Sequence, residues 1–189
     1  MTRIVLVEPQ HPGNVGAVAR AMANFGIEDL ALVNGCEIDD GGYARSKSGK
    51  PVLDNLVRFE SLEKALADCD VAIGTSGIKP EGDKRWFRVP KNVKELPEII
   101  KEREKPALVF GRENYGLYRE ELAMCEVTIT IPTNPEYPIL NLSHAVGIVL
   151  YEICRDDKQK SIKKRKSVSN EEFERLVDRI MNLLEETSY

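Results

Sequence analysis

Histidine and cysteine are scarce in this 189-residue chain, and their placement excludes the common metal sites. The sequence contains two histidines, His11 and His144, and four cysteines that form no CxxC pair. Zinc sites need several such ligands at short, characteristic spacings, so neither a structural nor a catalytic zinc centre is expected. The scattered cysteines are typical of reduced, mostly buried thiols in a cytoplasmic protein.

Long apolar runs are also absent. Asn, Ser and His interrupt the most apolar stretch, residues 140–150, which is too short to cross a bilayer. Residues 1–13, MTRIVLVEPQHPG, lack the apolar core and small-residue cleavage site of a signal peptide. We therefore expect a cytoplasmic protein that has no membrane partner.

The common nucleotide-binding fingerprints are missing as well. The sequence contains no Gly-Lys-Ser/Thr, which excludes a P-loop. Gly13 and Gly16 do not fit the G-x-G-x-x-G pattern, and the second expected strand ends at Asn34 and Gly35 without an acidic ribose ligand. The sequence therefore argues against a dinucleotide site.

Charge is distributed unevenly along the chain. The net charge is −4, from 27 Lys and Arg against 31 Asp and Glu, yet residues 158–166, KQKSIKKRK, carry no acidic group. Such a run is either a solvated linker or a contact for nucleic-acid phosphates. In the second case the contacts would come from Lys163, Lys164, Arg165 and Lys166.

Apolar segments of strand and helix type alternate along residues 1–156. Because most of the strand segments are continuous apolar runs, we expect an α/β domain with a parallel sheet covered by helices on both faces. A basic linker, 157–168, and an amphipathic C-terminal helix, 169–189, would follow this domain. Expected strands are 2–9, 30–33, 57–59, 70–77, 107–111 and 127–132, and expected helices are 14–26, 48–55, 62–69, 92–103, 118–125 and 142–155.

The loop at residues 131–141, IPTNPEYPILN, stands out because it contains three prolines. Pro132, Pro135 and Pro138 exclude a helix and a central strand, since proline fixes φ and lacks an amide donor. The remaining possibility is a stiff loop whose unpaired backbone groups are available to a ligand. Ligands of parallel α/β sheets bind beyond the carboxyl ends of the strands, where this loop is expected.

Several polar residues near that edge are candidates for function, although each also has an ordinary structural explanation. Asn14 can cap the first helix, Arg20 can be a surface residue, and Glu113 can favour a helix start. Asn141 and Ser143 are common capping residues. Taken alone, these residues indicate a ligand-binding α/β domain with a basic tail.

Three segments together resemble the motifs of a known family. HPGNVGAVARAMANFGI, LVFGRENYGL and IPTNPEYPILNLSHAVGIVLYEI are similar to the three motifs of the SpoU branch of the SPOUT RNA methyltransferases. The resemblance covers residues 4–153 in the family's order and spacing. TNPEYPILNLSHAV is closest to the TrmJ-type tRNA 2′-O-ribose methyltransferases, which act at position 32 of the anticodon loop.

This resemblance implies a deep C-terminal trefoil knot, a homodimer and S-adenosylmethionine as cofactor, with tRNA as substrate. The proline loop would wrap the cofactor and hold its adenine through backbone groups. The implied cofactor-binding residues are Thr75, Ser76, Gly77, Gly111, Ile131, Ile139 and Leu140.

The implied reaction moves a methyl group from a sulfonium to a ribose 2′-hydroxyl, and this activated donor requires no metal. By resemblance Arg20 has the key catalytic role, and Asn14, Glu113, Asn141 and Ser143 shape the site. Arg20 is either a general base or an electrostatic stabiliser, and the sequence leaves both open. Other possible functions are an rRNA 2′-O-methyltransferase, a non-catalytic knotted RNA-binding module and a flavodoxin-like nucleotide-binding protein.

Overall fold

The computed structural model describes residues 1–77, 89–159 and 170–186 of the chain. These residues fall into two compact units, Met1–Arg155 and Asp156–Tyr189. The first unit contains the sheet and all of the predicted catalytic and cofactor-binding residues. The predicted RNA contacts Lys163, Lys164, Arg165 and Lys166 lie outside the described residues.

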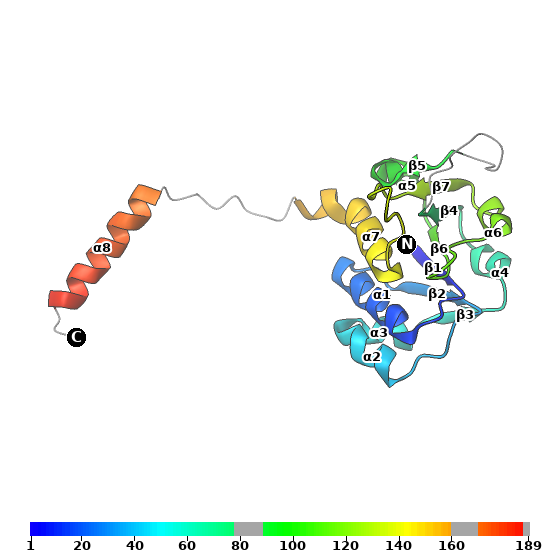
Figure 1. Ribbon diagram of the computed structural model, residues 1–189, viewed down its shortest axis with the longest axis horizontal. Coiled ribbons are helices and arrows are strands. Elements are labelled where there is room, and N and C mark those ends of the chain that lie inside the picture. The colour runs from blue at the N-terminus through cyan, green and yellow to red at the C-terminus, as the bar shows by residue number, and fades with distance from the viewer. Residues whose placement is uncertain (78–88, 160–169, 187–189) are drawn as a thin grey trace. The chain divides into compact units, whose positions relative to one another are not determined.

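A parallel sheet forms the centre of the first unit, as the apolar runs predict (Figure 1). Within the described residues it has seven strands in the order β3-β2-β1-β6-β4-β7-β5, and every recorded pairing is parallel. The strands are β1 (Arg3–Val7), β2 (Asp29–Val33), β3 (Val57–Phe59), β4 (Val71–Ser76), β5 (Lys91–Asn92), β6 (Pro106–Phe110) and β7 (Val127–Thr130).

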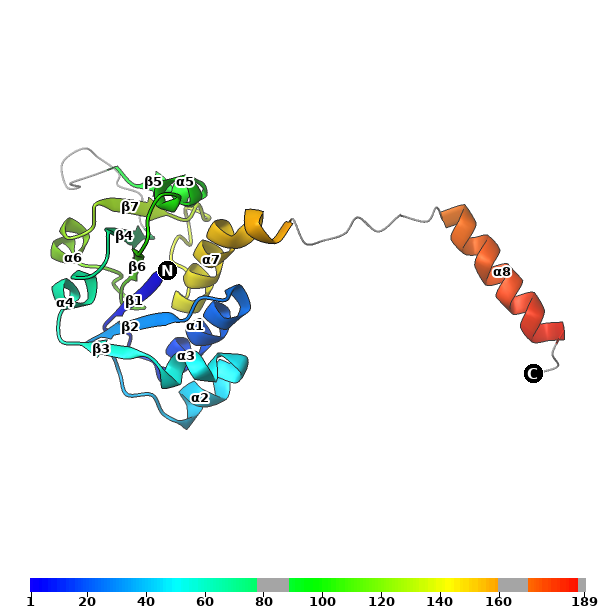
Figure 2. The ribbon, with the colours of Figure 1, turned by 180° about the vertical axis from the view of Figure 1, so that it is seen from behind.

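Helices cover both faces of this sheet, as Figures 1 and 2 show from opposite sides. One face packs against α1 (Pro12–Phe25), α3 (Lys50–Asp54), α5 (Leu96–Ile100) and α7 (Leu142–Gln159). The other face packs against α4 (Leu62–Leu66) and α6 (Arg119–Ala123). The predicted doubly covered α/β architecture is therefore confirmed.

The central strands are largely apolar because both of their faces are buried. In β1, Ile4 and Leu6 belong to the core beneath α1 and α7, whereas Val5 and Val7 belong to the core beneath α4 and α6. Alternation of side chains across the sheet thus divides one short run between two cores. Most polar side chains consequently lie at the strand ends and in the loops, although β7 contains the buried Thr128 and Thr130.

The start of α1 differs from the prediction that Asn14 is its N-cap. The helix begins at Pro12 after the N-cap His11, whose side chain makes no capping hydrogen bond. Proline is well suited to the first helical turn, because its fixed φ is already helical and its missing amide needs no partner there. Asn14 therefore lies inside the helix, and its side chain is available for other contacts.

Other helix boundaries also differ from the sequence pattern. The structure adds α2 (Asp40–Ser46), which the pattern missed, and divides the expected helix 48–55 into the 3₁₀ turn η1 (Lys47–Gly49) and α3. Residues 92–103 contain the 3₁₀ turn η2 (Val93–Glu95) followed by the short α5. At its other end α1 stops at Gly26, whose φ of 73° lies in the left-handed region that favours glycine. Of the four free cysteines only Cys125 is buried, so the expectation of mostly buried thiols is wrong.

The second unit contains α8 (Asn170–Glu186). Its apolar stripe, which the periodicity predicts, is exposed at Leu176, Ile180 and Leu183. Within the described part of the chain, no helix is long and apolar enough to cross a membrane.

Candidate active site

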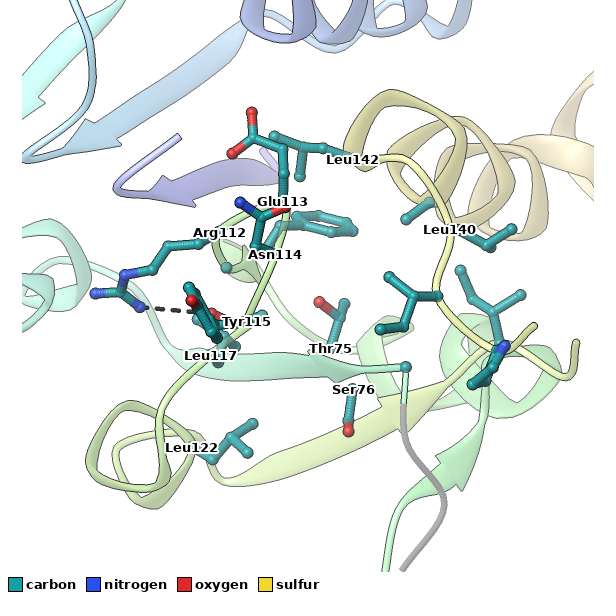
Figure 3. Close-up of a pocket in the computed structure, with 18 of the residues that line it drawn as sticks. Thr75, Ser76, Arg112, Glu113, Asn114, Tyr115, Leu117, Leu122, Leu140 and Leu142 are labelled. Carbon is teal, nitrogen blue, oxygen red and sulfur yellow. Dashed lines mark hydrogen bonds between the residues drawn. The ribbon is translucent and has the colours of Figure 1, made fainter. Parts of the chain in front are cut away.

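A pocket of about 500 Å³ lies beyond the carboxyl ends of β4, β6 and β7 (Figure 3). The end of β4, the loop after β6, the end of β7 and the residues that lead into α7 contribute its walls. All seven predicted cofactor-binding residues line it: Thr75, Ser76, Gly77, Gly111, Ile131, Ile139 and Leu140. The structure thus brings them together at one edge of the sheet, and their contact with a cofactor stays a prediction.

The loop after β6 is folded so tightly that it needs glycine at both ends. A Cβ on Gly111 would lie 2.0 Å from the backbone carbon of Gly116. Gly116 itself has a φ of 65°, in the left-handed region that favours glycine. The backbone of Arg112 pairs with that of Gly116 through hydrogen bonds of 3.1 and 2.9 Å. This turn directs Glu113, Asn114 and the loop backbone toward the pocket (Figure 3).

Arg112 holds the loop in place through ion pairs, and the sequence analysis did not select this residue. Its guanidinium donates to both carboxylate oxygens of Glu121 at 3.0 and 2.9 Å and to Glu8 at 2.9 Å. It also lies 3.9 Å from the ring centroid of Tyr118. Hydrogen bonds that Arg112 donates to Glu121 and Glu8 raise its pKa despite its burial. A buried arginine with two carboxylates therefore ties β1, the loop and α6 together.

The proline loop satisfies part of its own backbone, which corrects the prediction that its groups are unpaired. The amides of Glu136 and Tyr137 donate to Asn134 at 3.1 and 3.0 Å, and the Thr133 hydroxyl donates to the Pro138 carbonyl at 3.0 Å. Local turns formed by Asn and Thr are the physical reason, because these side chains bond to nearby backbone.

The end of the proline loop, in contrast, is open toward the pocket. A Cβ on Gly77 would lie 3.6 Å from the Pro138 carbonyl oxygen, so the loop passes close to the end of β4. Within the described residues, no backbone hydrogen bond engages Ile139 or Leu140. The Thr75 hydroxyl donates to the Val109 carbonyl at 3.0 Å and is thereby committed to the sheet. The pocket therefore offers apolar side chains and free backbone groups.

A chain of hydrogen bonds joins four of the five predicted catalytic residues. The Asn14 amide donates to Glu113 at 2.9 Å, and the Asn141 amide donates to the Asn14 oxygen at 3.1 Å. The Asn141 oxygen accepts from the Ser143 amide at 2.9 Å and from its hydroxyl at 2.8 Å. Segments separated by about a hundred residues are thus connected at the pocket edge. Asn141 also serves as the cap of α7, as expected for its type.

Glu113 is the anchor of this chain. Its carboxylate accepts from the backbone amides of Gln10 and His11 at 3.0 and 3.2 Å, in addition to Asn14. Partial burial opposes ionisation, but these hydrogen bonds outweigh it and hold the pKa of Glu113 below its ordinary value. Glu113 is consequently an ionised acceptor at neutral pH, which suits orientation of Asn14 better than proton transfer.

Arg20 is not part of this hydrogen-bond chain. It lies on the exposed side of α1, and within the described residues its side chain has no ion-pair partner. The turn η1 packs beside it, because a Cβ on Gly49 would lie 2.6 Å from the Arg20 amide nitrogen. The catalytic role assigned to Arg20 by resemblance stays a prediction. Within the same described residues, no group of three or more His, Cys, Asp or Glu is arranged to hold a metal ion.

The fold and the site together define an α/β ligand-binding protein whose pocket lies beside a hydrogen-bonded polar cluster at the carboxyl edge of a parallel sheet. The model of the SpoU rRNA methylase family matches residues 1–151, which is most of the first unit. The chain belongs to this family.

Named relatives are consistent with that membership. The chain is 41% identical over 155 residues to the tRNA (cytidine-2′-O-)-methyltransferase TrmJ of Methanocaldococcus jannaschii, covering 81% of this chain and 67% of that protein. It is 42% identical over 163 residues to the tRNA (cytidine/uridine-2′-O-)-methyltransferase TrmJ of Photorhabdus laumondii, covering 82% and 67%. The chain thus spans about two thirds of each relative.

A solved structure extends the similarity to three dimensions. The crystal structure of TrmJ from Z. mobilis ZM4 aligns with a TM-score of 0.74 and 30% identity. The alignment covers 100% of this chain and 82% of that one. The family motifs that the sequence resembles are therefore placed on the same fold.

Proposed function

We propose that this protein is an S-adenosylmethionine-dependent tRNA 2′-O-ribose methyltransferase that acts on cytidine or uridine at position 32 of the anticodon loop. The observation that carries the proposal is the hydrogen-bonded chain from Glu113 through Asn14 and Asn141 to Ser143, at the edge of the pocket. Two relatives at about 40% identity, both named TrmJ, supply the substrate class.

The pocket fits S-adenosylmethionine by the chemistry of its walls. Its volume of about 500 Å³ is within the range of small-molecule sites, and apolar residues such as Ile131, Ile139 and Leu140 form much of its lining. The free backbone groups of Ile139 and Leu140 can hold an adenine edge. When bound, the cofactor supplies a methyl group on a positively charged sulfur.

The polar cluster would hold the ribose. Ionised Glu113 fixes the orientation of the Asn14 side chain, and Asn141 links Asn14 to Ser143. Side chains held in this way can position a 2′-hydroxyl for in-line attack, so orientation accounts for much of the rate. We assign Arg20 to stabilising the developing alkoxide, because a guanidinium stays protonated in proteins and is a poor proton acceptor.

The finer features implied by the family belong to the same proposal. They are a deep trefoil knot formed by the C-terminal part of the first unit, a homodimer, and a cytoplasmic location with tRNA as partner. The proposed domain 1–156 would contain the catalytic machinery. The basic linker 157–168 and the helix 169–189 would add contacts to RNA or to protein.

Methyl transfer from labelled S-adenosylmethionine tests this function directly. Unmodified tRNA transcripts should accept the label, and ribosomal RNA fragments should not. The second substrate is included because the matching family is described as rRNA methylases. Label on ribosomal RNA alone would establish that alternative, and no transfer to either RNA, with intact RNA binding, would establish a non-catalytic module.

A further inference from the structure

A second hollow, of about 340 Å³, lies beside the polar cluster, because Asn14 is one of its lining residues. Its lining residues come from the start of α1 and from α2 with its cap: His11, Pro12, Gly13, Asn14, Asp39, Gly41 and Arg45. Asn14 lines this hollow and donates at 2.9 Å to Glu113, which lines the first pocket. One hydrogen-bonded pair therefore connects the linings of the two hollows.

Glycines allow α2 to approach α1 closely enough to place Arg45 there. A Cβ on Gly16 would lie 2.0 Å from the carbonyl oxygen of Gly42, so the two helices are in backbone contact. A Cβ on Gly13 would lie 3.0, 3.1 and 3.2 Å from Cδ, Nε and Cζ of Arg45. The Arg45 side chain thus lies across the first turn of α1, in tight contact with Gly13.

The Arg45 guanidinium has no counter-ion in the described part of the chain. Asp39, the nearest acidic lining residue in the hollow, uses its Oδ1 to accept from the Gly42 amide at 2.8 Å as the cap of α2. Buried or bridging cations elsewhere behave differently: Arg3 binds Asp29 and Asp68, and Arg112 binds Glu8 and Glu121. Arg45 is therefore an exposed guanidinium with its donors available.

Three more Lys and Arg side chains on neighbouring elements also lack an ion pair among the described residues. Arg20, Lys47 and Lys50 lie on α1, η1 and the start of α3, and among the described residues none of their side chains forms an ion pair. Gly13 and Arg20 are seven residues apart, which places them on one side of α1 and about 10 Å apart along its axis. Cationic side chains without an ion pair among the described residues thus extend from the hollow along one side of α1.

We propose that the second hollow receives the RNA backbone phosphate that adjoins the methylated ribose, with the Arg45 guanidinium as its main contact. This inference rests on the proposed function and specifies how its substrate is held. The methyl donor then lies on the Glu113 side of the Asn14–Glu113 pair and the phosphate on the Asn14 side, so that the ribose lies between them. A planar guanidinium fork is well suited to bind phosphate through two hydrogen bonds.

The test combines a protein substitution with a single-atom change in the RNA. Anticodon stem-loops are prepared with a normal phosphate, or with one uncharged methylphosphonate beside the target nucleotide. Single-turnover methyl transfer and RNA affinity are then measured for wild type, Arg45→Ala and Arg45→Lys. The matched control is Arg103→Ala, since Arg103 is also exposed and unpaired among the described residues but precedes β6, at the opposite edge of the sheet.

We expect Arg45→Ala to lower kcat/KM for the normal RNA by about 10- to 100-fold, the size of one charge-assisted hydrogen-bonded contact. S-adenosylmethionine affinity should be unchanged, Arg45→Lys should recover part of the loss, and Arg103→Ala should match wild type. With methylphosphonate RNA, wild type and Arg45→Ala should become equal, because the charge that Arg45 binds is gone.

Two results would overturn the inference. The first is a wild-type rate for Arg45→Ala on normal RNA, and the second is a loss of equal size on both RNAs, which would place the Arg45 contact elsewhere. Should wild type transfer no methyl group to any RNA, the proposed function fails instead. In that case the RNA affinities of the two variants still test the phosphate contact. Equal affinities of Arg45→Ala and Arg103→Ala would overturn it.

Discussion

Glu113 illustrates how one carboxylate can be important without exchanging a proton. Three hydrogen bonds to its oxygens lower its pKa, so its stabilising contribution is complete above the ordinary value of about 4.5 and is lost as the pH falls through the lower folded value. We expect Glu113→Gln to reduce methyl transfer while leaving the shape of the pH–rate profile between pH 6 and 9 unchanged.

Single-turnover rates across that pH range would check this prediction for Glu113. Thermal unfolding at pH 3 to 7 provides the complementary measurement, because wild type should lose its stability advantage over Glu113→Gln only in the acidic part of the range. A limb of the rate profile near neutral pH that disappears in Glu113→Gln would show that Glu113 is instead the general base.

For Arg20 the structural and the functional interpretations differ most. As an exposed side chain, Arg20→Ala should change the free energy of unfolding by no more than about 0.5 kcal/mol. As the group that stabilises the alkoxide, its loss should lower the methyl-transfer rate by about 10²-fold or more, with cofactor affinity unchanged. Arg20→Lys should recover little activity, since a point charge does not reproduce the planar fork.

Saturating RNA and cofactor in a single-turnover assay separate chemistry from binding in these Arg20 variants. A rate close to wild type for Arg20→Ala under those conditions would remove Arg20 from the mechanism.

Replacing Arg112 should destabilise the whole protein, because its ion pairs connect separate elements. Its removal would leave the largely buried Glu121 carboxylate with the Tyr118 amide but no counter-ion among the described residues, so Arg112→Ala should destabilise the protein by about 3 kcal/mol. The matched control is Lys101→Ala, because Lys101 and Glu98 form an exposed pair whose loss should cost less than about 0.5 kcal/mol. Denaturant unfolding measures both, and equal midpoints would contradict the bracing role of Arg112.

The family resemblance grouped four residues that the structure also brings together. Asn14, Glu113, Asn141 and Ser143 were selected from their motifs, and the structure joins them in one hydrogen-bonded chain. Arg112 was missed because a single arginine between a glycine and a glutamate carries no periodic signal. Its importance arises from Glu8 and Glu121, which become neighbours only after the sheet has formed.

Among the elements, strands were predicted better than short helices. Buried strands such as β1 and β6 are continuous apolar runs, and their period and length leave few alternatives. The helix α2 contains Gly41 and Gly42, which are poor helix formers, and its close packing against α1 supplies what propensity does not. That tertiary contact cannot be predicted from the local sequence pattern.

The tight loop after β6 gives an element-level prediction. Gly111→Ala places a Cβ at 2.0 Å from the backbone of Gly116, and the loop must shift to relieve the contact. We expect weaker cofactor binding together with a loss of stability of about 1 to 3 kcal/mol. Isothermal titration with S-adenosylmethionine and thermal unfolding measure the two effects.

Gly147→Ala is the control for this loop, because a Cβ there meets nothing within 4 Å and the position lies inside α7. This variant should bind the cofactor as wild type does and should be as stable or up to about 1 kcal/mol more stable. Identical behaviour of the two alanine variants would show that the loop tolerates a side chain at Gly111.

At the scale of the whole molecule, we expect the basic run at residues 158–166 to contribute to RNA affinity. Replacing Lys163, Lys164, Arg165 and Lys166 by neutral residues should weaken RNA binding and leave S-adenosylmethionine binding intact. If all four contact phosphates, the slope of log affinity against log salt should flatten by roughly 3 to 4 units. A slope equal to that of wild type would identify the run as a solvated linker.

The most direct test for the molecule as a whole is to locate the methyl group on the RNA. Unmodified tRNA transcript is incubated with the protein and S-adenosylmethionine, digested to nucleosides and fragments, and analysed by mass spectrometry, with Arg20→Ala in parallel. We predict one 2′-O-methylated cytidine or uridine at position 32, formed by wild type and nearly absent with the variant. A methyl group on a base, or no methylation of any tRNA, would contradict the proposed function.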